Sequence, residues 1–529
     1  MNGTSMNDDA LIQLQRDTFR YFLEETNRDN GLVRDSTRAG SDSSITAIGF
    51  ALAAYIIGVE RDFISRADAL ERTLTTLRFL WNSPQGEERD ATGHKGFFYH
   101  FLEMHTGRRA GNCELSTIDT TFLVAGVLAA AAYFDRDLKD EFEIRELADL
   151  LYRRVDWTWA LNGGATVSHG WRPERGFLDA RWDGYSEAIM LYALGMGSPT
   201  HPLPDDSYQV WTRSYQWKKV DGQEFLYAAP LFIHQLSHVW IDFRGIPDDY
   251  MRERGIDYFE NSRRATLAQQ QYAIRNPKNY SGYGEFCWGI TASDGPGPDA
   301  RTIGGIERRF FDYVARGIPD GPDDGTIAPW AVVASLPFAP EIVLPTICYL
   351  NEAYPQTMSK YGLRCSFNPT FGDPSQDKQA WHSQRYYGLD QGPVVLMIEN
   401  YLSSFVWNLM KRCPYVVSGL RRAGFTNGWL QMLSGNSLEG GAMLHKDPQD
   451  DKAHDEKSSE SPADALARRK LEHEKRTGPN LLPDRTWLHE SGYGGSHGKP
   501  RTSSDEREDS ELNLPVPEQP KSRLPDDAP

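Results

Sequence analysis

Several carboxylates in this sequence stand where acid–base chemistry is usually built, beside glycines, aromatic residues and apolar segments. Glu187 lies between WDGYS and the apolar segment AIMLYALGMG, and Asp390 follows two tyrosines in YYGLDQGP. Asp119 lies within the apolar segment STIDTTFLVAGVL. Each has a structural alternative, because Glu187 and Asp390 would also serve as helix caps and Asp119 as a hydrogen-bonded core acid. Acting together, such paired carboxylates predict cleavage or transfer of glycosidic bonds.

Aromatic side chains near these acids would provide flat apolar surfaces for sugar rings. The candidates are Trp182, Tyr185, Trp288, Trp381 and Tyr387. Polar side chains in the same loops would hydrogen-bond sugar hydroxyls, and the candidates are Arg172, His234, Glu285 and Asp294. We therefore predict a carbohydrate site assembled from loops that adjoin buried helices.

Other reaction classes lack their characteristic residues. His234 and His238 have the spacing of zinc ligands on a helix, but no Glu follows the first His as it does in zinc proteases. The five cysteines are scattered without a C-x-x-C pair, so we expect free thiols. The sequence has no P-loop and no dinucleotide-binding fingerprint. We expect neither a metal nor a cofactor.

The charge balance limits the class of partner. The chain has 74 Asp and Glu against 57 Lys and Arg, a formal net charge of −17. This excess argues against nucleic acid or an anionic membrane, and no apolar run reaches the length of a membrane span. The N-terminal stretch MNGTSMNDDALIQLQ has neither the basic nor the apolar region of an export signal. The expected compartment is the cytoplasm, with the periplasm as the alternative if a signal has been trimmed.

Helical segments that are apolar nearly all round alternate with amphipathic ones. The apolar segments are 44–59, 116–134, 186–196 and 390–411, and 230–243 also reads as a helix. Amphipathic helices are predicted at 9–25 and 141–161. The only strand signal is a short hairpin around GHKGFFYHFLEMHTGRR. The pattern predicts an all-α fold with an inner ring of helices wrapped by an outer ring.

The composition changes near residue 434. Residues 434–529 are charged and rich in Pro, Ser and acid, and they contain too little apolar surface to offset the entropy of ordering them. We predict one domain at 1–433, followed by a mostly disordered tail at 434–529.

The motifs resemble those of the glycoamylase-like domain family, whose characterised members are similar to endo-β-1,2-glucanases of glycoside hydrolase family 144. The resemblance covers residues 18–430 and is carried by long strings, among them CELSTIDTTFLVAGVL, GYSEAIMLYALGMGSPTHP, PLFIHQLSHVWIDFRG and YYGLDQGPVVLMIENY. It implies an (α/α)6 toroid that hydrolyses β-1,2-glucan with inversion. By motif, Glu187 matches the family's acid, Asp390 the base side and Asp119 a further functional carboxylate. Family members generally carry Asn where this chain has Ser186.

Two other activities stay open at this point. A related domain in cyclic β-1,2-glucan synthases performs transglycosylation, so the same site would transfer glucan to a glucan acceptor if water were excluded. The second alternative is a protein that binds glucan without catalysing a reaction on it. The preferred reading is a hydrolase that acts on β-1,2-glucan, as an endo-glucanase or by release of sophorose.

Overall fold

The computed structural model describes residues 7–372, 380–435, 494–495 and 501–502. The predicted tail at 434–529 lies almost entirely outside the described residues. So does the short segment 373–379, which separates two of the loops discussed below.

Five helices are buried along nearly their whole surface, which explains why their sequences are apolar on every side. They are α2 (Ile45–Glu60), α4 (Thr117–Tyr133), α6 (Ile189–Gly197), α10 (Pro329–Ala334) and α12 (Gly388–Ser403). We call these five the inner helices.

Amphipathic helices cover the inner ones and expose their polar sides. They are α1 (Asp8–Glu24), α3 (Arg66–Asn82), α5 (Lys139–Arg153), α9 (Tyr258–Arg275), α11 (Pro340–Ala353) and α14 (Pro414–Arg422). Ser65 caps α3, because its hydroxyl accepts from the amide of Asp68 in the first turn. Shorter helices are α7 (Ser207–Thr212), α8 (Asp249–Arg254), α13 (Phe405–Met410) and α15 (Gly428–Gly435).

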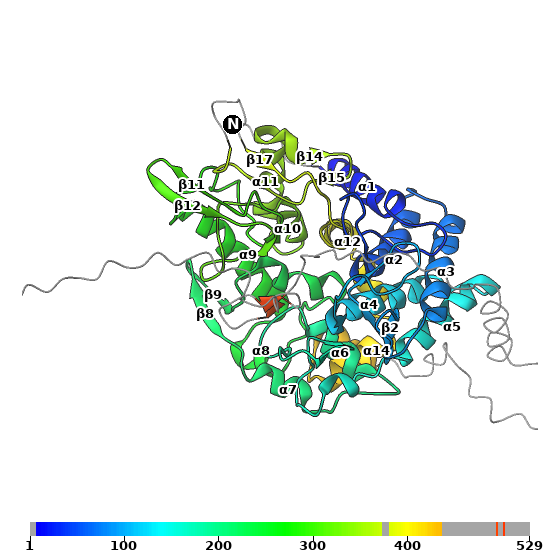
Figure 1. The fold of residues 1–529 in the computed structure, drawn as a ribbon. Coiled ribbons are helices and arrows are strands. Elements are labelled where there is room, and N and C mark those ends of the chain that lie inside the picture. The colour runs from blue at the N-terminus through cyan, green and yellow to red at the C-terminus, as the bar shows by residue number, and fades with distance from the viewer. Residues whose placement is uncertain (1–6, 373–379, 436–493, 496–500, 503–529) are drawn as a thin grey trace, which may run out of the picture.

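The inner helices contact one another in a consistent order. Helix α2 packs against α4 and α12, α4 packs against α6, and α12 packs against α10. Figure 1 shows α12, from late in the described chain, beside α1 and α2 from its beginning. The outer helices follow the same order, with α3 and α5 together and α14 against α6. Most of these contacts join inner helices that are neighbours along the chain, and α12 also returns to pack against α2.

Two glycines allow α2 and α4 to touch through their backbones. A Cβ on Gly49 would lie 2.3 Å from the carbonyl oxygen of Phe122, and a Cβ on Gly126 would lie 2.0 Å from that of Gly49. Both distances are far inside van der Waals contact, so no other residue fits at this crossing without separating the helices.

Four predicted helices differ from the structure. The helix predicted at 141–161 corresponds to α5, which ends at Arg153, and residues 159–161 form a 3-10 turn. The segment 230–243 forms two 3-10 helices, η2 (Leu231–His234) and η3 (Leu236–Val239), and no α-helix. Tertiary bonds hold it in this form, because Gln235 donates to the carbonyl of Ala331 and Ser237 donates to the carbonyl of Glu187. The helix predicted to begin at residue 186 begins at Ile189. The helix predicted at 390–411 ends at Ser403, and Ser404 with a φ of 57° separates it from α13.

The prediction of a purely helical chain is corrected by short antiparallel strands. One sheet joins β2 (Gly93–His94), β3 (Phe97–Tyr99), β5 (Leu115–Ser116), β6 (Gly170–Arg172) and β7 (Gly176–Phe177) in that order. The predicted hairpin is its β2–β3 edge, with Gly93 opposite Phe98. Strands of two or three residues show no alternation of polar and apolar side chains, so the other strands of this sheet could not be predicted from the sequence.

The remaining strands form separate two-stranded pairs, including one beside the start of α2. That pair is β1 (Ser43–Ser44) with β4 (Phe101–Leu102). The others are β8 (Trp217–Val220) with β9 (Gln223–Leu226), β10 (Ala292–Ser293) with β13 (Val314–Ala315), β11 (Asp299–Ile303) with β12 (Ile306–Phe310), β14 (Met358–Ser359) with β15 (Gly362–Leu363), β16 (Phe367–Asn368) with β17 (Trp381–His382), and β18 (Gly494–Gly495) with β19 (Arg501–Thr502). Two further 3-10 turns are η1 (Trp159–Leu161) and η4 (Pro355–Thr357).

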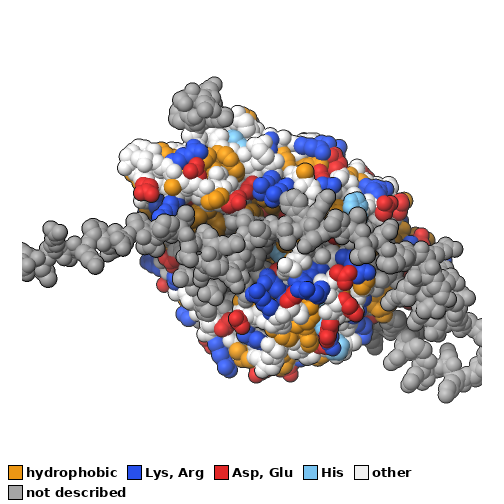
Figure 2. Space-filling model, in the orientation of Figure 1, with side chains coloured by type: hydrophobic (Ala, Val, Ile, Leu, Met, Phe, Trp, Pro, Cys, Tyr) orange, Lys and Arg blue, Asp and Glu red, His pale blue; other side chains and the backbone are white. Residues whose placement is uncertain are grey.

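The surface carries charges of both signs. Figure 2 shows Lys and Arg interspersed with Asp and Glu over the visible face. Within the described ranges, every helix falls short of the length and apolar character required to cross a bilayer. The candidate acids, in contrast, lie inside the molecule, at the ends of the inner helices.

Candidate active site

Glu187 lies in the turn that precedes α6 and is completely buried. Neither carboxylate oxygen has a hydrogen-bond partner among the described residues. Burial raises the pKa of Glu187 from 4.5 to about 8, and the negative charge of Asp119 contributes to the rise. The N-cap of α6 is Ala188, with no side-chain cap, so the helix-cap reading of Glu187 is wrong. Glu187 is a carboxyl group that holds its proton at neutral pH.

Asp119 occupies the first turn of α4 and is hydrogen bonded on both oxygens. Oδ1 accepts from the Thr46 hydroxyl of α2 at 2.6 Å, and Oδ2 accepts from the Ser116 hydroxyl at 2.5 Å. The Ser116 hydroxyl also caps α4 by accepting from the amide of Asp119. Asp119 therefore joins the starts of α2 and α4, as expected of a hydrogen-bonded core acid. Its negative charge also acts on Glu187.

A buried histidine connects Asp119 to a second acid. His100 follows β3, and its Nδ1 lies 2.9 Å from Oε1 of Glu114, while its Nε2 lies 3.6 Å from Oδ1 of Asp119. Burial alone lowers the pKa of His100, but Asp119, Glu114 and Asp35 outweigh it and raise that pKa to about 9. Burial raises the pKa of Glu114, and the imidazolium lowers it by more.

Arg172, predicted to bind a sugar hydroxyl, lies on β6 beside this group. Its Nη2 is 3.7 Å from Oε2 of Glu114. The half-buried guanidinium and the buried carboxylate form a long ion pair that also lowers the pKa of Glu114. The structure therefore brings Arg172 together with Asp119 through Glu114 and His100.

Asp390 lies in the first turn of α12 and, like Glu187, is completely buried. Both of its carboxylate oxygens lack a hydrogen-bond partner within the part of the chain that the structure describes. Burial raises its pKa well above the ordinary value; Asp35 and Asp294 add to the rise, and the nearby Cys365 thiol offsets part of it. The side chain caps nothing, because Tyr387 is the N-cap and makes no side-chain cap bond.

The N-terminal loop connects Asp390 to the histidine group. The amide of Gly388 donates to the carbonyl of Asp35 at 2.8 Å, two residues before Asp390. The same loop continues into β1, which pairs with β4 directly after His100. The charge of Asp35 acts on both His100 and Asp390. The three predicted carboxylates therefore lie at the N-terminal ends of inner helices, linked by this loop and by the Thr46–Asp119 bond.

The aromatic candidates next to Glu187 are buried and hydrogen bonded. The indole of Trp182 donates to the Thr117 hydroxyl at 2.9 Å and stacks on His169. The Tyr185 hydroxyl lies 3.3 Å from Nδ1 of His234. Trp182 and Tyr185 are each 1% exposed, so in this structure they support the site from behind and present no open face to a sugar.

The candidates from the second half of the chain divide into two sets. Asp294 belongs with Asp390, and its Oδ2 accepts from the Ser383 hydroxyl at 2.6 Å. Tyr387, the residue before α12, has its hydroxyl 3.3 Å from Arg385, and Trp381 is half-buried on β17. Trp288 is fully buried and donates to Thr346 of α11, while Glu285 is exposed. Trp288 therefore acts as a core side chain of the α11 layer.

The histidine pair does not form a metal site. His234 and His238 lie on different 3-10 helices, and Nε2 of His238 is 2.9 Å from the Ser262 hydroxyl. Burial lowers the pKa of His234 to about 4 and that of His238 to about 3, so both are neutral. Among the described residues, no three His, Cys, Asp or Glu side chains are grouped as metal ligands.

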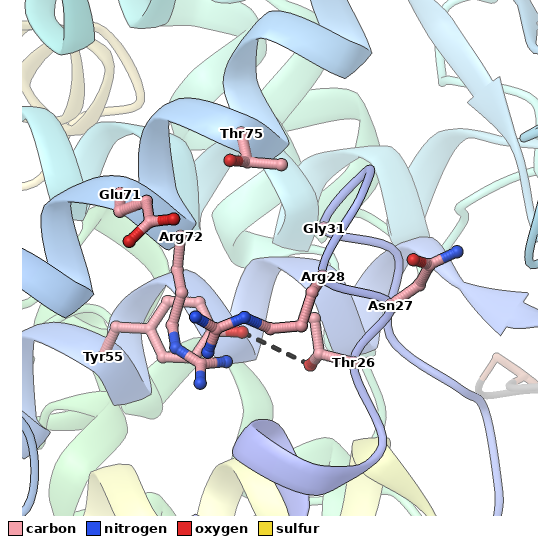
Figure 3. A pocket seen from close by; sticks show the side chains of 8 residues that line it. All are labelled: Thr26, Asn27, Arg28, Gly31, Tyr55, Glu71, Arg72 and Thr75. Atoms are coloured by element: carbon pink, nitrogen blue, oxygen red, sulfur yellow. Dashed lines mark hydrogen bonds between the residues drawn. The ribbon is translucent and has the colours of Figure 1, made fainter.

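A shallow pocket elsewhere on the surface contains none of these candidates. Figure 3 shows it between the loop after α1 and the helices α2 and α3, where the Thr26 and Tyr55 hydroxyls lie 3.3 Å apart. Its lining residues are Thr26, Asn27, Arg28, Gly31, Tyr55, Glu71, Arg72 and Thr75. It is separate from the helix ends that carry the buried acids.

His100, Glu114 and Asp35 are the site residues that sequence reasoning missed. Glu114 lies just before the apolar segment that contains Asp119, and in the structure it faces His100 across two paired strands. The signal that would have drawn attention to His100 is its place in the FFYHF string, where a polar residue interrupts a run of buried aromatic side chains.

Comparison with known proteins places this site in a family. Residues 179–414, which include Glu187 and Asp390, match the Glycoamylase family model, described as "Putative glucoamylase". A solved structure from Bacteroides uniformis with the same description is 31% identical, with a TM-score of 0.71, and the match covers 81% of this chain and 100% of that one.

Two further relatives have named activities. The endo-β-1,2-glucanase of Chitinophaga pinensis, solved with sophorotriose and glucose, is 26% identical with a TM-score of 0.70 over 80% of this chain and 100% of that one. The exo β-1,2-glucooligosaccharide sophorohydrolase of Parabacteroides distasonis is 28% identical over 79% of this chain, which spans 58% of that protein's length. With its helical fold, its family match and a relative at 31% identity over its full length, this chain belongs to the glycoamylase-like family.

Proposed function

We propose that this protein is a glycoside hydrolase that cleaves β-1,2-glucan and that Glu187 is its general acid. The observation that carries the proposal is the environment of Glu187, a buried carboxyl without a hydrogen-bond partner in the described structure and with a pKa of about 8. A group with that pKa is protonated at neutral pH and can deliver its proton to a leaving glycosidic oxygen. The β-1,2-glucan specificity is supported by the named activities of the two relatives.

Asp119 sets the proton affinity of the acid. Its two hydroxyl bonds stabilise the carboxylate where it lies, and its charge opposes ionisation of Glu187. Glycosidases use carboxyl groups in different roles, and one of them is commonly an acid with a raised pKa. Asp119 therefore helps to keep the proton on Glu187.

Asp390 is the base side of the proposed inverting reaction. It activates a water molecule on the opposite face of the sugar, directly or through a proton relay. Its buried carboxyl has a raised pKa, so it becomes a base only when substrate and water reach it and restore hydration. Arg172, Asp294, His234 and Glu285 are proposed to bond hydroxyls, and the rings of Trp381 and Tyr387 to contact sugar, with Trp182, Tyr185 and Trp288 shaping the site from within.

The fold we propose for this chemistry is an (α/α)6 toroid. Its inner ring would comprise α2, α4, α6, the η2–η3 segment, α10 and α12. Support comes from the contacts between successive members, including Ser237 of η3 with Glu187 and Gln235 with α10. In that arrangement the N-terminal ends of the inner elements, and hence the three acids, face the same opening.

The experiment that tests the function is incubation with linear β-1,2-glucan, laminarin, cellulose oligomers and starch, with reducing ends measured over time. We expect new reducing ends from β-1,2-glucan alone. Sophorose as the main product would mean exo action, and a range of oligosaccharides would mean endo action. Cleavage of starch alone would make the substrate assignment wrong.

The same reactions distinguish the two other activities. Longer products in the presence of added sophorose-series acceptors, without net new reducing ends, would indicate a transglycosylase. Heat of binding in a calorimeter without any product would indicate a glucan-binding protein. Either result would overturn the hydrolase proposal.

A further inference from the structure

Asp119, in the first turn of α4, lies beside a buried histidine, His100. None of the bonds described above joins this histidine to Glu187. His100 is 2% exposed, and its ring lies between two buried carboxylates, 2.9 Å from Glu114 and 3.6 Å from Asp119. Its backbone is fixed as well, because its amide donates to the carbonyl of Glu114 and its carbonyl accepts from the amide of Ile45. The ring therefore has one position, set by a strand and by the first residue of α2.

A neutral imidazole would satisfy this position poorly. One ring nitrogen of a neutral imidazole is an acceptor, and it would face a carboxylate that is also an acceptor. A protonated ring donates from both nitrogens, toward Glu114 and toward Asp119. Buried carboxylates without a cation are strongly disfavoured. Arg172 lies 3.7 Å from Glu114, farther from it than the histidine ring.

We propose that His100 is a positioning residue, a charged imidazolium between two buried carboxylates that holds Asp119 in place beside the acid Glu187. This inference rests on the proposed function, because it concerns the same acid. His100 acts through Asp119, whose charge keeps the proton on Glu187 until the leaving oxygen takes it. Loss of the imidazolium would let Asp119 move from its place beside Glu187, and the acid would lose part of the negative charge that helps to hold its proton.

The surrounding titratable groups are consistent with a single cation at this point. From the N-terminal loop Asp35 adds a third negative influence, and together the three acids raise the pKa of His100 to about 9. His169, which faces Glu114 from the segment before β6, has a pKa lowered by burial to about 4 and is neutral. Burial raises the pKa of the Cys113 thiol to about 12, so it is neutral as well. His100 and the more distant Arg172 are the cations of the described group.

The first test is the pH profile of kcat/KM on β-1,2-glucan for His100→Gln. A weaker negative charge beside Glu187 lowers the pKa of this acid, so the alkaline limb should move downward by about 1 pH unit or more, with activity best retained at lower pH. His201→Gln is the matched control, because His201 is an exposed histidine 3.7 Å from Asp156, and its profile should not move. A drop of equal size at every pH would mean a structural role only and would overturn the proposal.

A second measurement does not depend on substrate. In protein labelled with 15N-histidine, the ring signal that disappears in His100→Gln should show an imidazolium at pH 8. Titration of that signal near pH 6.5 would overturn the proposal whatever the activity. If the wild-type protein cleaves none of the glucans, the proposed function fails, and an imidazolium found by NMR would then be structural.

A third variant covers the case in which His100→Gln does not fold. Glu114→Gln keeps an acceptor for Nδ1 but removes one of the two facing charges. The His100 signal should then titrate about 1 pH unit or more lower than in the wild type. An unchanged titration would show that Glu114 does not hold the charge on His100, against the proposal.

Discussion

Two buried acids in this protein lie in opposite surroundings. Asp324 faces Arg316, and both side chains are completely buried; the guanidinium donates to the two carboxylate oxygens at 2.8 Å each. Arg316 also donates to the carbonyls of Ser293 and Phe311, and it lowers the pKa of Asp324 against the effect of burial. Glu187 has the same burial and no partner in the described structure, and its pKa rises.

The difference separates an acid that holds the fold from an acid kept for chemistry. Desolvation disfavours any buried carboxylate, and the protein resolves this in one of two ways. Asp324 is ionised and joins Arg316, the residue after β13, to the loop that leads to α10. Glu187 is left protonated and reactive. The comparison predicts that the two acids respond differently to the same chemical change, from acid to amide.

The largest effect is expected for Asp324→Asn, on stability. The change leaves the buried guanidinium of Arg316 without its counter-charge, which costs about 3–5 kcal/mol. Urea unfolding at pH 7 measures the loss. The matched control is Asp299→Asn, because Asp299 is on the exposed β11–β12 hairpin and its pair with Arg301 lies in solvent; its unfolding curve should hardly change. If both variants unfold alike, the buried pair is not what holds these loops.

The next largest effect is expected for Glu187→Gln, on turnover. The amide keeps the shape but cannot give a proton, so kcat on β-1,2-glucan should fall by about 10²-fold or more. An aryl glycoside with a good leaving group, if accepted, should lose less, whereas Asp390→Asn should not be rescued in that way. Glu352→Gln, an exposed change on α11, serves as the control. Normal turnover in Glu187→Gln would remove this residue from the reaction.

The smallest effect concerns how stability depends on pH. Folded Glu187, with a pKa of about 8, keeps a proton that the unfolded chain releases near 4.5. The free energy of unfolding therefore falls as pH rises between these values, with a slope from this group of at most about 1.4 kcal/mol per pH unit. Asp324, with its lowered pKa, acts in the opposite direction and loses stability only as the solution becomes acidic.

Urea unfolding of the wild type and Glu187→Gln at pH 5, 6, 7 and 8 isolates the first of these terms. The variant should gain stability relative to the wild type at each step toward pH 8. Parallel curves would mean that Glu187 is ionised in the folded protein, contrary to its role as an acid.

The sequence predicted the inner helices well, because a segment that is apolar on every side has few alternatives to full burial. The boundaries of α2 and α4 agree with the expectation within a residue or two. The start of α6 does not, because the Ser237 hydroxyl takes the carbonyl of Glu187 and the amide of Met190, bonds that replace the first turn of the helix. Such bonds come from a segment distant in sequence and leave no local pattern.

The candidate acids were also predictable from apolar segments of sequence, but the hydrogen-bond partners of their side chains were not. A carboxylate beside an apolar segment is visible in the sequence, as at Glu187 and Asp390. Whether it finds a partner depends on the assembled fold, and Asp119 finds two while Glu187 finds none. The pairing of His100 with Glu114 arises from the register of β3 and β5, which cannot be predicted from strands of two or three residues. The resemblance to the glycoamylase-like family supplied the roles that local pattern alone could not.

The contact of Gly49 with the α4 backbone sets a length scale for the chemistry. Gly49 lies one turn after Thr46, and the Phe122 carbonyl it touches lies one turn after Asp119. The 2.6 Å bond between Thr46 and Asp119 is therefore adjacent to a crossing where the two backbones meet without side chains. A methyl group added at Gly49 would push α2 and α4 apart, and the displacement would reach Asp119, one turn away. The geometry of the site therefore depends on Gly49 and Gly126, which carry only a hydrogen atom in place of a side chain at this crossing.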